Sequence, residues 1–248
     1  MENSLTKLKI LSIDIGGSNI KATVLNQKGE LTKEYEKIAT PSPATPGNVL
    51  VAINTLVKDF PAYDRISVGF PGYVKKGVVK TAPNLENDLW KNVDFAKKLE
   101  EVLGKPAKVV NDADMQGLGV VAGKGLELVI TLGTGFGTAW LMDGNLLPHL
   151  EFSHQPFNKF KSYDKYIGEK ALEKEGAKKW NLRMQKVFEV LKTVFNYDFL
   201  YIGGGNSSKL NFKLDKNMKI VTNAEGIKGG ARLWVKSELP ETKTEIVA

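Results

Sequence analysis

The sequence predicts an α/β fold in which two similar lobes surround a central cleft. Short apolar stretches that end at glycine turns alternate with stretches whose apolar residues have helical spacing. A pattern of buried strand, glycine turn and return strand occurs twice, at Ile13 and Ile130, although two occurrences leave chance similarity open. The length of 248 residues fits one large domain or two small ones. We expect residues 1–112 to form an N-terminal lobe and residues 113–248 a C-terminal lobe.

The first half of the chain contains the clearer pattern. Apolar runs bounded by glycine, proline or asparagine predict strands, and apolar residues three or four positions apart predict helices. Proline residues in the low forties mark a loop between the third strand and the first helix. The predicted strands are 8–15, 20–25, 30–38, 65–70 and 107–110, and the predicted helices are 49–60, 93–103 and 113–122.

The second half repeats this plan with a longer helical part. Apolar runs predict strands at 126–132, 138–142, 199–202 and 219–221. Trp180, Val187 and Leu191 are core candidates of a helix predicted over 166–195. A glycine-containing segment, 224–235, is predicted as a helix that packs closely on another element.

The composition excludes several classes of protein. With no cysteine, the chain has no disulfide, no thiolate zinc site and no cysteine nucleophile. The 42% hydrophobic and 25% charged residues are typical of a globular protein in solution. No apolar run approaches the roughly 18 residues of a membrane span, and no apolar segment of a secretory signal follows the N-terminus. We therefore expect a cytoplasmic protein that binds no membrane.

The positive charge is unevenly distributed. The formal net charge is +7, of which +6 lies in residues 151–248 and +1 in residues 1–150. A cationic surface suits an anionic ligand, but a solvated lysine-rich helical face explains the same excess. Nucleic-acid binding is not expected, because the chain has no basic motif interleaved with aromatic residues.

Three glycine loops follow predicted strands and could bind phosphate. Glycine allows several backbone N–H groups to point at one anion, although a tight turn alone also explains each loop. Asp14 lies two residues before the first loop, where a carboxylate could hold Mg²⁺ directly or through water. The loops comprise Gly16, Gly17, Ser18 and Asn19, then Gly133, Thr134 and Gly135, then Gly203, Gly204 and Gly205.

Asp112 is the candidate general base, since a hydroxyl attacks poorly until its proton has an acceptor. It follows Asn111 at the end of a predicted strand, where a helix begins. Helix capping explains an aspartate there equally well. Asp114 is a competing carboxylate, but it is expected inside the first helical turn.

Glu151 and His154 form a second candidate pair. Pro148 and Pro156 favour a loop around them, in which a carboxylate and an imidazole could hold neighbouring sugar hydroxyls. A buried structural histidine is the alternative. With two histidines in the chain, a zinc site of three histidines is impossible.

Together these motifs resemble the ROK sugar kinases of the actin/hexokinase superfamily, and among them the short polyphosphate glucokinases. The resemblance runs from about residue 9 to residue 234. The motifs, in the family's order, are Asp14–Lys21, Gly69–Gly72, Asn84, Val110–Asp114, Leu132–Gly135, Glu151–His154, Leu200–Gly205 and Asn223–Gly226.

The resemblance implies an actin-like, ribonuclease H-like fold and a set of roles. Asp112 would be the catalytic base and Asp14 would face the metal. Gly204 and Gly205 would lie along a nucleotide. Sugar-binding residues would be Asn111, Glu151, His154, Gly72 and Asn84, and phosphate-binding residues would be Gly16, Gly17, Ser18, Asn19, Lys21, Gly133, Thr134 and Gly135.

The sequence departs from the family after His154. The cysteine-rich zinc motif usual there is absent, so residues 155–166 must orient His154 in another way. Ser153 replaces the usual glycine, and Glu169 is the candidate for a further sugar-binding glutamate. Because the first strand is predicted to start near residue 8, we do not expect the DNA-binding helices of the family's repressors here.

The resemblance therefore implies phosphoryl transfer from ATP, polyphosphate or both to the 6-hydroxyl of glucose or a related hexose. Mg²⁺ would assist, no zinc would be involved, and we expect a homodimer. A ROK kinase for mannose, fructose or an N-acetyl hexosamine is one alternative. A non-catalytic actin-like nucleotide-binding protein is another, and it would need neither Asp112 nor the pair Glu151 and His154.

Overall fold

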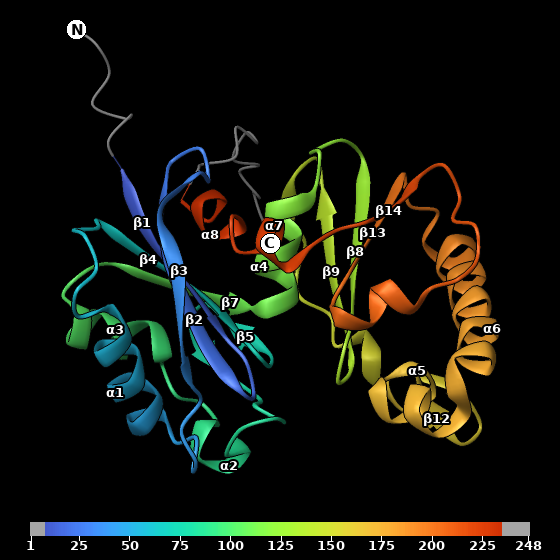
Figure 1. Cartoon of the computed structure of the whole chain (residues 1–248), viewed down its shortest axis with the longest axis horizontal. Coiled ribbons are helices and arrows are strands. Elements are labelled where there is room, and N and C mark those ends of the chain that lie inside the picture. Colours follow the sequence, from blue (N-terminus) through green and yellow to red (C-terminus); the bar gives the residue numbers. More distant parts are fainter. Residues whose placement is uncertain (1–7, 235–248) are drawn as a thin grey trace, which may run out of the picture.

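The computed structural model describes residues 8–234 and contains two five-stranded sheets that lie side by side (Figure 1). In the first sheet, the order is β3-β2-β1-β4-β7. Neighbours β1, β2 and β3 are antiparallel, whereas β4 and β7 continue the sheet in parallel. These strands are β1 (Lys9–Ile15), β2 (Asn19–Asn26), β3 (Leu31–Ala39), β4 (Arg65–Phe70) and β7 (Ala107–Asn111).

The second sheet has the same plan, which confirms the internal repeat. Its order is β10-β9-β8-β13-β14, with three antiparallel strands followed by two parallel ones. In both sheets, a glycine turn joins the central strand to its antiparallel neighbour. The strands are β8 (Leu126–Leu132), β9 (Phe136–Met142), β10 (Asn145–Leu146), β13 (Phe199–Gly203) and β14 (Met218–Ile220).

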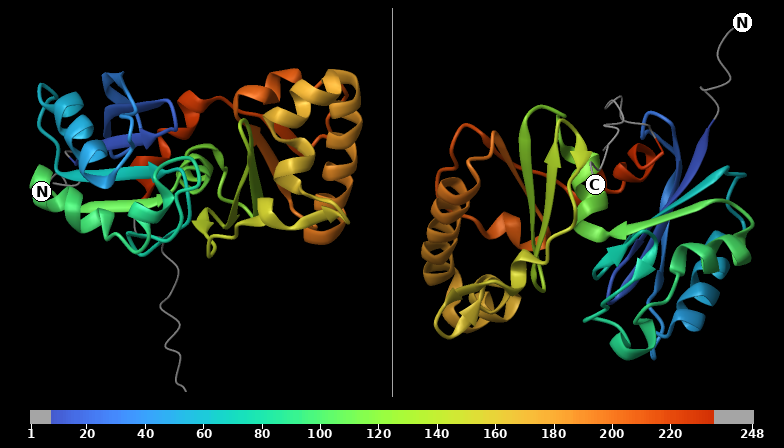
Figure 2. Two further views of the ribbon diagram at one scale, coloured as in Figure 1. Left: turned by 90° about the horizontal axis from the view of Figure 1, so that it is seen from below. Right: turned by 180° about the vertical axis from the view of Figure 1, so that it is seen from behind.

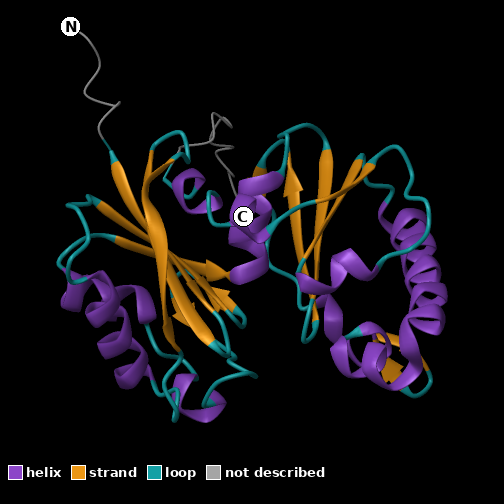
Figure 3. Cartoon of the chain, in the orientation of Figure 1, coloured by secondary structure: helices purple, strands orange, loops and turns teal. Residues whose placement is uncertain are grey.

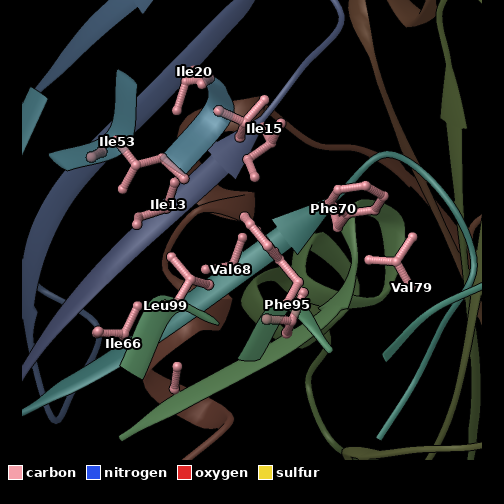
Figure 4. Packing of buried hydrophobic residues seen from close by; sticks show 14 of the residues in the cluster. Ile13, Ile15, Ile20, Ile53, Ile66, Val68, Phe70, Val79, Phe95 and Leu99 are labelled. Atoms are coloured by element: carbon pink, nitrogen blue, oxygen red, sulfur yellow. The ribbon is translucent and has the colours of Figure 1, made fainter. Parts of the chain in front are cut away.

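Two helices cover one face of the first sheet. Helix α1 (Pro46–Val57) begins with a proline, and the hydroxyl of Thr45 accepts a hydrogen bond from the N–H group of Asn48, the third residue of the helix. Helix α3 (Phe95–Leu103) ends at Gly104, whose φ of 67° suits glycine. Their apolar residues pack with those of β1, β2 and β4 in a single core, in which Ile13, Ile53 and Phe95 are fully buried (Figure 4).

A long helix covers the outer side of the second sheet (Figures 2 and 3). Helix α6 (Glu169–Phe195) buries Trp180, Val187 and Leu191 against that sheet, as predicted. It differs from the predicted single helix over 166–195 in two ways. A separate helix, α5 (Tyr163–Ile167), precedes it, and Gly176 with φ 76° kinks it.

Helix α4 (Asp112–Val120) lies between the two sheets and packs on two short helices, α7 (Asn223–Gly226) and α8 (Gly229–Arg232). The approach is so close that a Cβ on Gly229 would lie 1.8 Å from the carbonyl oxygen of Met115. The predicted helix over 224–235 is wrong in length, because two short helices take its place, and residue 235 lies outside the described residues.

The end of the described chain returns to the first sheet. The buried hydroxyls of Ser12 and Ser67 donate hydrogen bonds to the carbonyl oxygens of Ile227 (2.8 Å) and Gly230 (2.6 Å). Ile227 and helix α8 therefore contact the sheet formed by residues 9–111, and a lobe boundary at residue 112 stays a prediction.

Several short elements carry no pattern that predicts them. In the described part of the chain, no helix is both long and apolar enough to cross a membrane. The remaining elements are β5 (Val74–Lys75), β6 (Val78–Val79), α2 (Asn87–Trp90), β11 (Pro156–Asn158), β12 (Lys161–Ser162) and two 3-10 helices, Phe152–His154 and Gly205–Lys209.

The close contact of α4 with α8 gives a stability prediction. We expect Gly229→Ala to lower the free energy of unfolding by roughly 1–3 kcal/mol, because its methyl group overlaps a backbone carbonyl. Gly47→Ala, near the start of α1, meets nothing within 4 Å and should change stability by less than about 1 kcal/mol. Urea unfolding of both variants tests the contact, and equal stabilities would contradict it.

Candidate active site

Asp112 is the first residue of α4, directly after β7. The side chain of Asn111 caps the helix, because its Oδ1 accepts hydrogen bonds from the N–H groups of Ala113 (2.8 Å) and Asp114 (3.3 Å). One carboxylate oxygen of Asp112 also accepts from Ala113, at 2.8 Å. Asn111 therefore supplies the cap, and the capping alternative does not account for an aspartate at position 112.

Asp112 lines a pocket of about 270 Å³ to which both sheets contribute. The loops after β8 and β13 form one wall, whereas strands β1, β2 and β3 form the other. The structure thus brings the predicted base together with Asp14, Lys21, Gly133, Gly204 and Gly205. The other predicted phosphate-binding residues do not line this pocket; they are Gly16, Gly17, Ser18, Asn19, Thr134 and Gly135. Its lining residues are Asp14, Lys21, Tyr35, Asp112, Ala113, Met115, Gln116, Thr131, Gly133, Gly204, Gly205, Gly226 and Ile227.

Negative charge is concentrated on one side of this pocket. Burial raises the pKa of Asp14, and Lys21, whose Nζ lies 4.0 Å from Oδ2 of Asp14, opposes that shift. Burial also raises the pKa of Asp112 to about 7, and the charge of Asp14 adds to the increase. The N–H group of Ala113 acts in the opposite direction. Asp112 is thus able to accept a proton near neutral pH.

Asp14 and Asp112 are the carboxylates of this pocket that could hold a metal ion. Because Asp14 and Asp112 raise each other's energy when both are charged, a cation near them would relieve the repulsion. Among residues 8–234, no group of three or more histidine and acidic side chains could hold a metal. Two carboxylates are donors of the kind that Mg²⁺ takes, since this ion keeps several waters and binds one or two carboxylates besides substrate phosphates.

The first two glycine loops are tight turns with N–H groups left over. Gly16 donates to the carbonyl oxygen of Asn19 (2.9 Å), and Gly133 donates to that of Gly135 (3.1 Å). The turn interpretation therefore holds for these two N–H groups. Within the described residues, the next N–H groups, those of Gly17 and Ser18 and those of Thr134 and Gly135, donate to no protein acceptor. They remain available to an anion.

The third glycine loop has a packing reason as well. Gly204 has φ 84°, and a Cβ on it would lie 2.3 Å from the carbonyl oxygen of Leu132. Asn206 donates from Nδ2 to the carbonyl oxygen of Gly133 (3.3 Å) and so joins the loop after β13 to the loop after β8. Only glycine allows the chain this close to the backbone of Leu132.

The predicted sugar-binding residues lie outside that pocket, in two groups. Asn111 donates from Nδ2 to the carbonyl oxygen of Gly72 (3.1 Å), and a Cβ on Gly72 would overlap the carbonyl of Thr81. Asn84 lies near the first glycine loop, with its Cβ 3.9 Å from the place of a Cβ on Gly17. These contacts join the sugar-side group to the phosphate loop.

Glu151 and His154 form the second group and lie around the 3-10 helix Phe152–His154. Their side chains are 3.8 Å apart, Glu151 Oε2 to His154 Nε2. Glu151 is half-buried, whereas the side chain of His154 is 71% exposed, so His154 is not a buried structural histidine. Neither lines the pocket of Asp112.

His149 is a residue that the sequence reasoning missed. Its Nδ1 lies 2.9 Å from Oδ2 of Asp114 and its Nε2 lies 3.5 Å from Oε1 of Glu151, with 7% of the side chain exposed. Its ring also stacks on Tyr73 at 5.7 Å between centroids. The signal available in the sequence was a second histidine two residues before Glu151.

The two carboxylates around His149 determine its charge. Burial alone would lower the pKa of His149, but the ion pairs with Asp114 and Glu151 raise it to about 9. Burial raises the pKa of Asp114, which His149 opposes, and His149 lowers the pKa of Glu151. A protonated His149 therefore holds Glu151 to the first turn of α4.

An aromatic cluster holds the segment after His154, where no cysteine is present. Phe157 stacks on Tyr166 at 4.2 Å, and Phe152 packs on Tyr163 at 4.7 Å. The exposed Glu169 starts α6 and donates its N–H to the carbonyl oxygen of Gly133 (3.1 Å). Aromatic packing thus orders this segment.

The two lobes of repeated topology and the glycine-lined pocket between them define the actin-like ATPase fold. The chain belongs to the ROK family, whose family model matches residues 10–149. The fold class and the family predicted from the sequence are both confirmed.

Relatives of known kind support this assignment. A polyphosphate glucokinase of Mycobacterium tuberculosis (strain CDC 1551 / Oshkosh) is 33% identical, over 79% of this chain and 77% of its own. The inorganic polyphosphate/ATP-glucomannokinase of Arthrobacter sp. strain KM is 33% identical, with a TM-score of 0.81 over 92% of this chain and 98% of its own. A ROK family glucokinase from Streptomyces griseus, 20% identical with a TM-score of 0.75, covers 91% of this chain and 98% of its own and shares the fold.

The ion pairs of His149 predict a pH-dependent contribution to stability. Because its pKa rises from about 6.5 to about 9 on folding, protonation of His149 stabilises the folded protein fully below pH 6.5. This contribution is lost as the pH rises through 9. The difference in unfolding free energy between wild type and His149→Phe, which keeps a ring on Tyr73, should therefore narrow from pH 6 to pH 10. A constant difference in urea unfolding would contradict the ion pairs.

Proposed function

We propose that this chain is a sugar kinase that transfers a phosphoryl group from polyphosphate, ATP or both to the 6-hydroxyl of glucose or a related hexose. The observation that carries the proposal is that the carboxylate of Asp112, with a pKa of about 7, shares one pocket with the glycine loops after β8 and β13. The kinase names of the relatives that are 33% identical support the same activity.

Asp112 is the general base of the proposed reaction. The 6-hydroxyl of the sugar loses its proton to this carboxylate as the hydroxyl oxygen attacks the terminal phosphorus of the donor. Asn111, Gly72 and Asn84 hold sugar hydroxyls on one side, and Glu151 and His154 hold them on the other. Closure of the lobes excludes water, which would otherwise compete with the sugar as acceptor.

The glycine loops and two charged side chains bind the donor. The N–H groups of Gly17, Ser18, Thr134 and Gly135 and the ammonium group of Lys21 neutralise the phosphates; Gly16, Asn19 and Gly133 shape the turns. Gly204 and Gly205 give a flat wall for a nucleotide. Asp14 would hold Mg²⁺ through water, and when bound this ion reduces the negative charge of the transferred group.

Three further features belong to this proposal. The enzyme uses no zinc, acts as a homodimer and works in the cytoplasm. Mannose is the first alternative sugar to test, because the relative from Arthrobacter is named a glucomannokinase.

Replacement of the base tests the mechanism. We expect Asp112→Asn to reduce kcat about 10²–10⁴-fold, because an amide accepts no proton from the sugar. The matched control is Asp143→Asn, the same change in a turn where φ is 50°, a conformation that asparagine also adopts. A coupled assay of glucose 6-phosphate measures both, and full turnover by Asp112→Asn would disprove its role.

The pH dependence provides an independent test. Since Asp112 must be ionised to accept a proton and its pKa is about 7, kcat/KM for glucose should rise with pH and level off above about 7. The residual activity of Asp112→Asn should lack this rise. If kcat/KM instead rose with a midpoint near pH 4, the base would be a carboxylate of ordinary pKa.

The donor is tested by direct comparison. Glucose-dependent formation of ADP from ATP, or shortening of polyphosphate, distinguishes a kinase from a non-catalytic nucleotide-binding protein. A panel of glucose, mannose, fructose and N-acetyl hexosamines with each donor then gives the sugar. Absence of sugar phosphate with every combination would reject the proposed function.

A further inference from the structure

Two lysines face each other across strands β2 and β3 beside the pocket. Lys21 is paired with Lys37 in the antiparallel register, and the neighbouring pair is Ile20 with Ile38. Ile20 and Ile38 belong to the core beneath α1. Because successive side chains point to opposite faces of a sheet, Lys21 and Lys37 lie on the face that bears Asp14 and the pocket.

This arrangement is unfavourable for the protein alone. Directly paired residues of antiparallel strands have Cβ atoms about 4.5–5.5 Å apart, and like charges there destabilise the sheet. Lys21 has one carboxylate nearby, Asp14 at 4.0 Å. Lys37 is exposed and forms no ion pair with any residue in the range 8–234. An anion that spans the two ammonium groups would remove the repulsion.

A third lysine on the same strand shows that this exposure is not a general property of β3. Lys33 forms an ion pair with Glu36 at 2.6 Å, and its Nζ lies 4.7 Å from the centre of the Phe60 ring. The register shifts between Ala22 and Val24, so that Lys33 pairs with the core residue Val24 and turns to the α1 side. The ammonium group of Lys33 therefore has partners within the protein, whereas that of Lys37 forms no ion pair with a described residue.

Tyr35 lies between Lys33 and Lys37 on β3 and lines the pocket. It is 47% exposed, lines the pocket and shares a face with Lys37 two residues later. The hydroxyl of Tyr35 can donate a hydrogen bond to a phosphate oxygen. Lys21 and Tyr35 thus line the pocket that also contains Asp112, and Lys37 lies next to them on the edge strand β3, outside the residues that line the pocket.

We propose that Lys21, Tyr35 and Lys37 form a subsite for the donor phosphates beyond the transferred one, and that a linear polyphosphate leaves the pocket along this strand pair. The inference rests on the proposed function, because it assumes that the donor lies with its terminal phosphate near Asp112. It assigns the polyanion contact to the N-terminal sheet, not to the lysine-rich residues 151–248.

Substitutions at Lys37 test the subsite with a control on the same strand. We expect Lys37→Gln to reduce kcat/KM for polyphosphate about 3–10-fold at low salt and to weaken its dependence on salt, while KM for glucose stays unchanged. The loss with ATP should be smaller, because three phosphates extend less far from Asp112. Lys33→Gln removes the same charge from the other face and should leave both donors unaffected.

Lys37→Glu separates binding from folding. A carboxylate opposite Lys21 should leave the thermal midpoint unchanged or raise it, and it should weaken polyphosphate binding further than Lys37→Gln. Equilibrium titration with polyphosphate in the absence of sugar gives the affinity without reference to turnover. A lower midpoint together with unchanged affinity would mean that Lys37 has only a structural role.

Other results would overturn the subsite in distinguishable ways. Wild-type protein that phosphorylates no sugar would reject the proposed function itself. Active wild type with unchanged polyphosphate affinity in both Lys37 variants would reject the subsite alone. If the Lys37 variants lose the same factor of binding affinity for a single-stranded oligonucleotide as for polyphosphate, the surface binds polyanions in general, which also contradicts a donor subsite.

Discussion

The close packing of helix α4 between the two sheets is the constraint on which the site depends. Gly229 on α8 and Gly119 on α4 allow backbones to approach where a Cβ would lie 1.8 Å and 2.4 Å from carbonyl oxygens. This contact holds the first turn of α4, and with it Asp112, at the junction of the lobes. A lower packing density there would move the proposed base relative to the glycine loops after β8 and β13.

The site concentrates unlike charges in separate places. Asp14 and Asp112 both line the pocket, and burial, with the charge of Asp14 adding to it, raises the pKa of Asp112 to about 7. Lys21 and the glycine loops after β8 and β13 line the same pocket. His149 adds a buried positive charge between Asp114 and Glu151 on the sugar side. The proposed proton acceptor and the proposed anion-binding groups can therefore lie close together without neutralising each other.

Prediction from sequence succeeded where a local pattern had a local cause. The strand Arg65–Phe70 was predicted to the residue, because an apolar run there ends at a proline and a glycine. Strands of two residues, such as Val74–Lys75, were not predicted, because they are too short to show an alternation of apolar and polar residues. The helix predicted over 166–195 failed at Gly168, where a turn between α5 and α6 interrupts a continuous helical pattern.

The sequence by itself determined the two-lobed repeat, the glycine loops and the position of Asp112 at a strand end, because each depends on residues next to one another in the chain. Only the tertiary structure decided that Asn111 donates to the carbonyl oxygen of Gly72 and that His149 pairs with Asp114. The same is true of Lys37, which faces Lys21 whereas Lys33 turns away. Burial, pKa and cross-strand register arise from residues that are distant in sequence, and no local pattern encodes those distances.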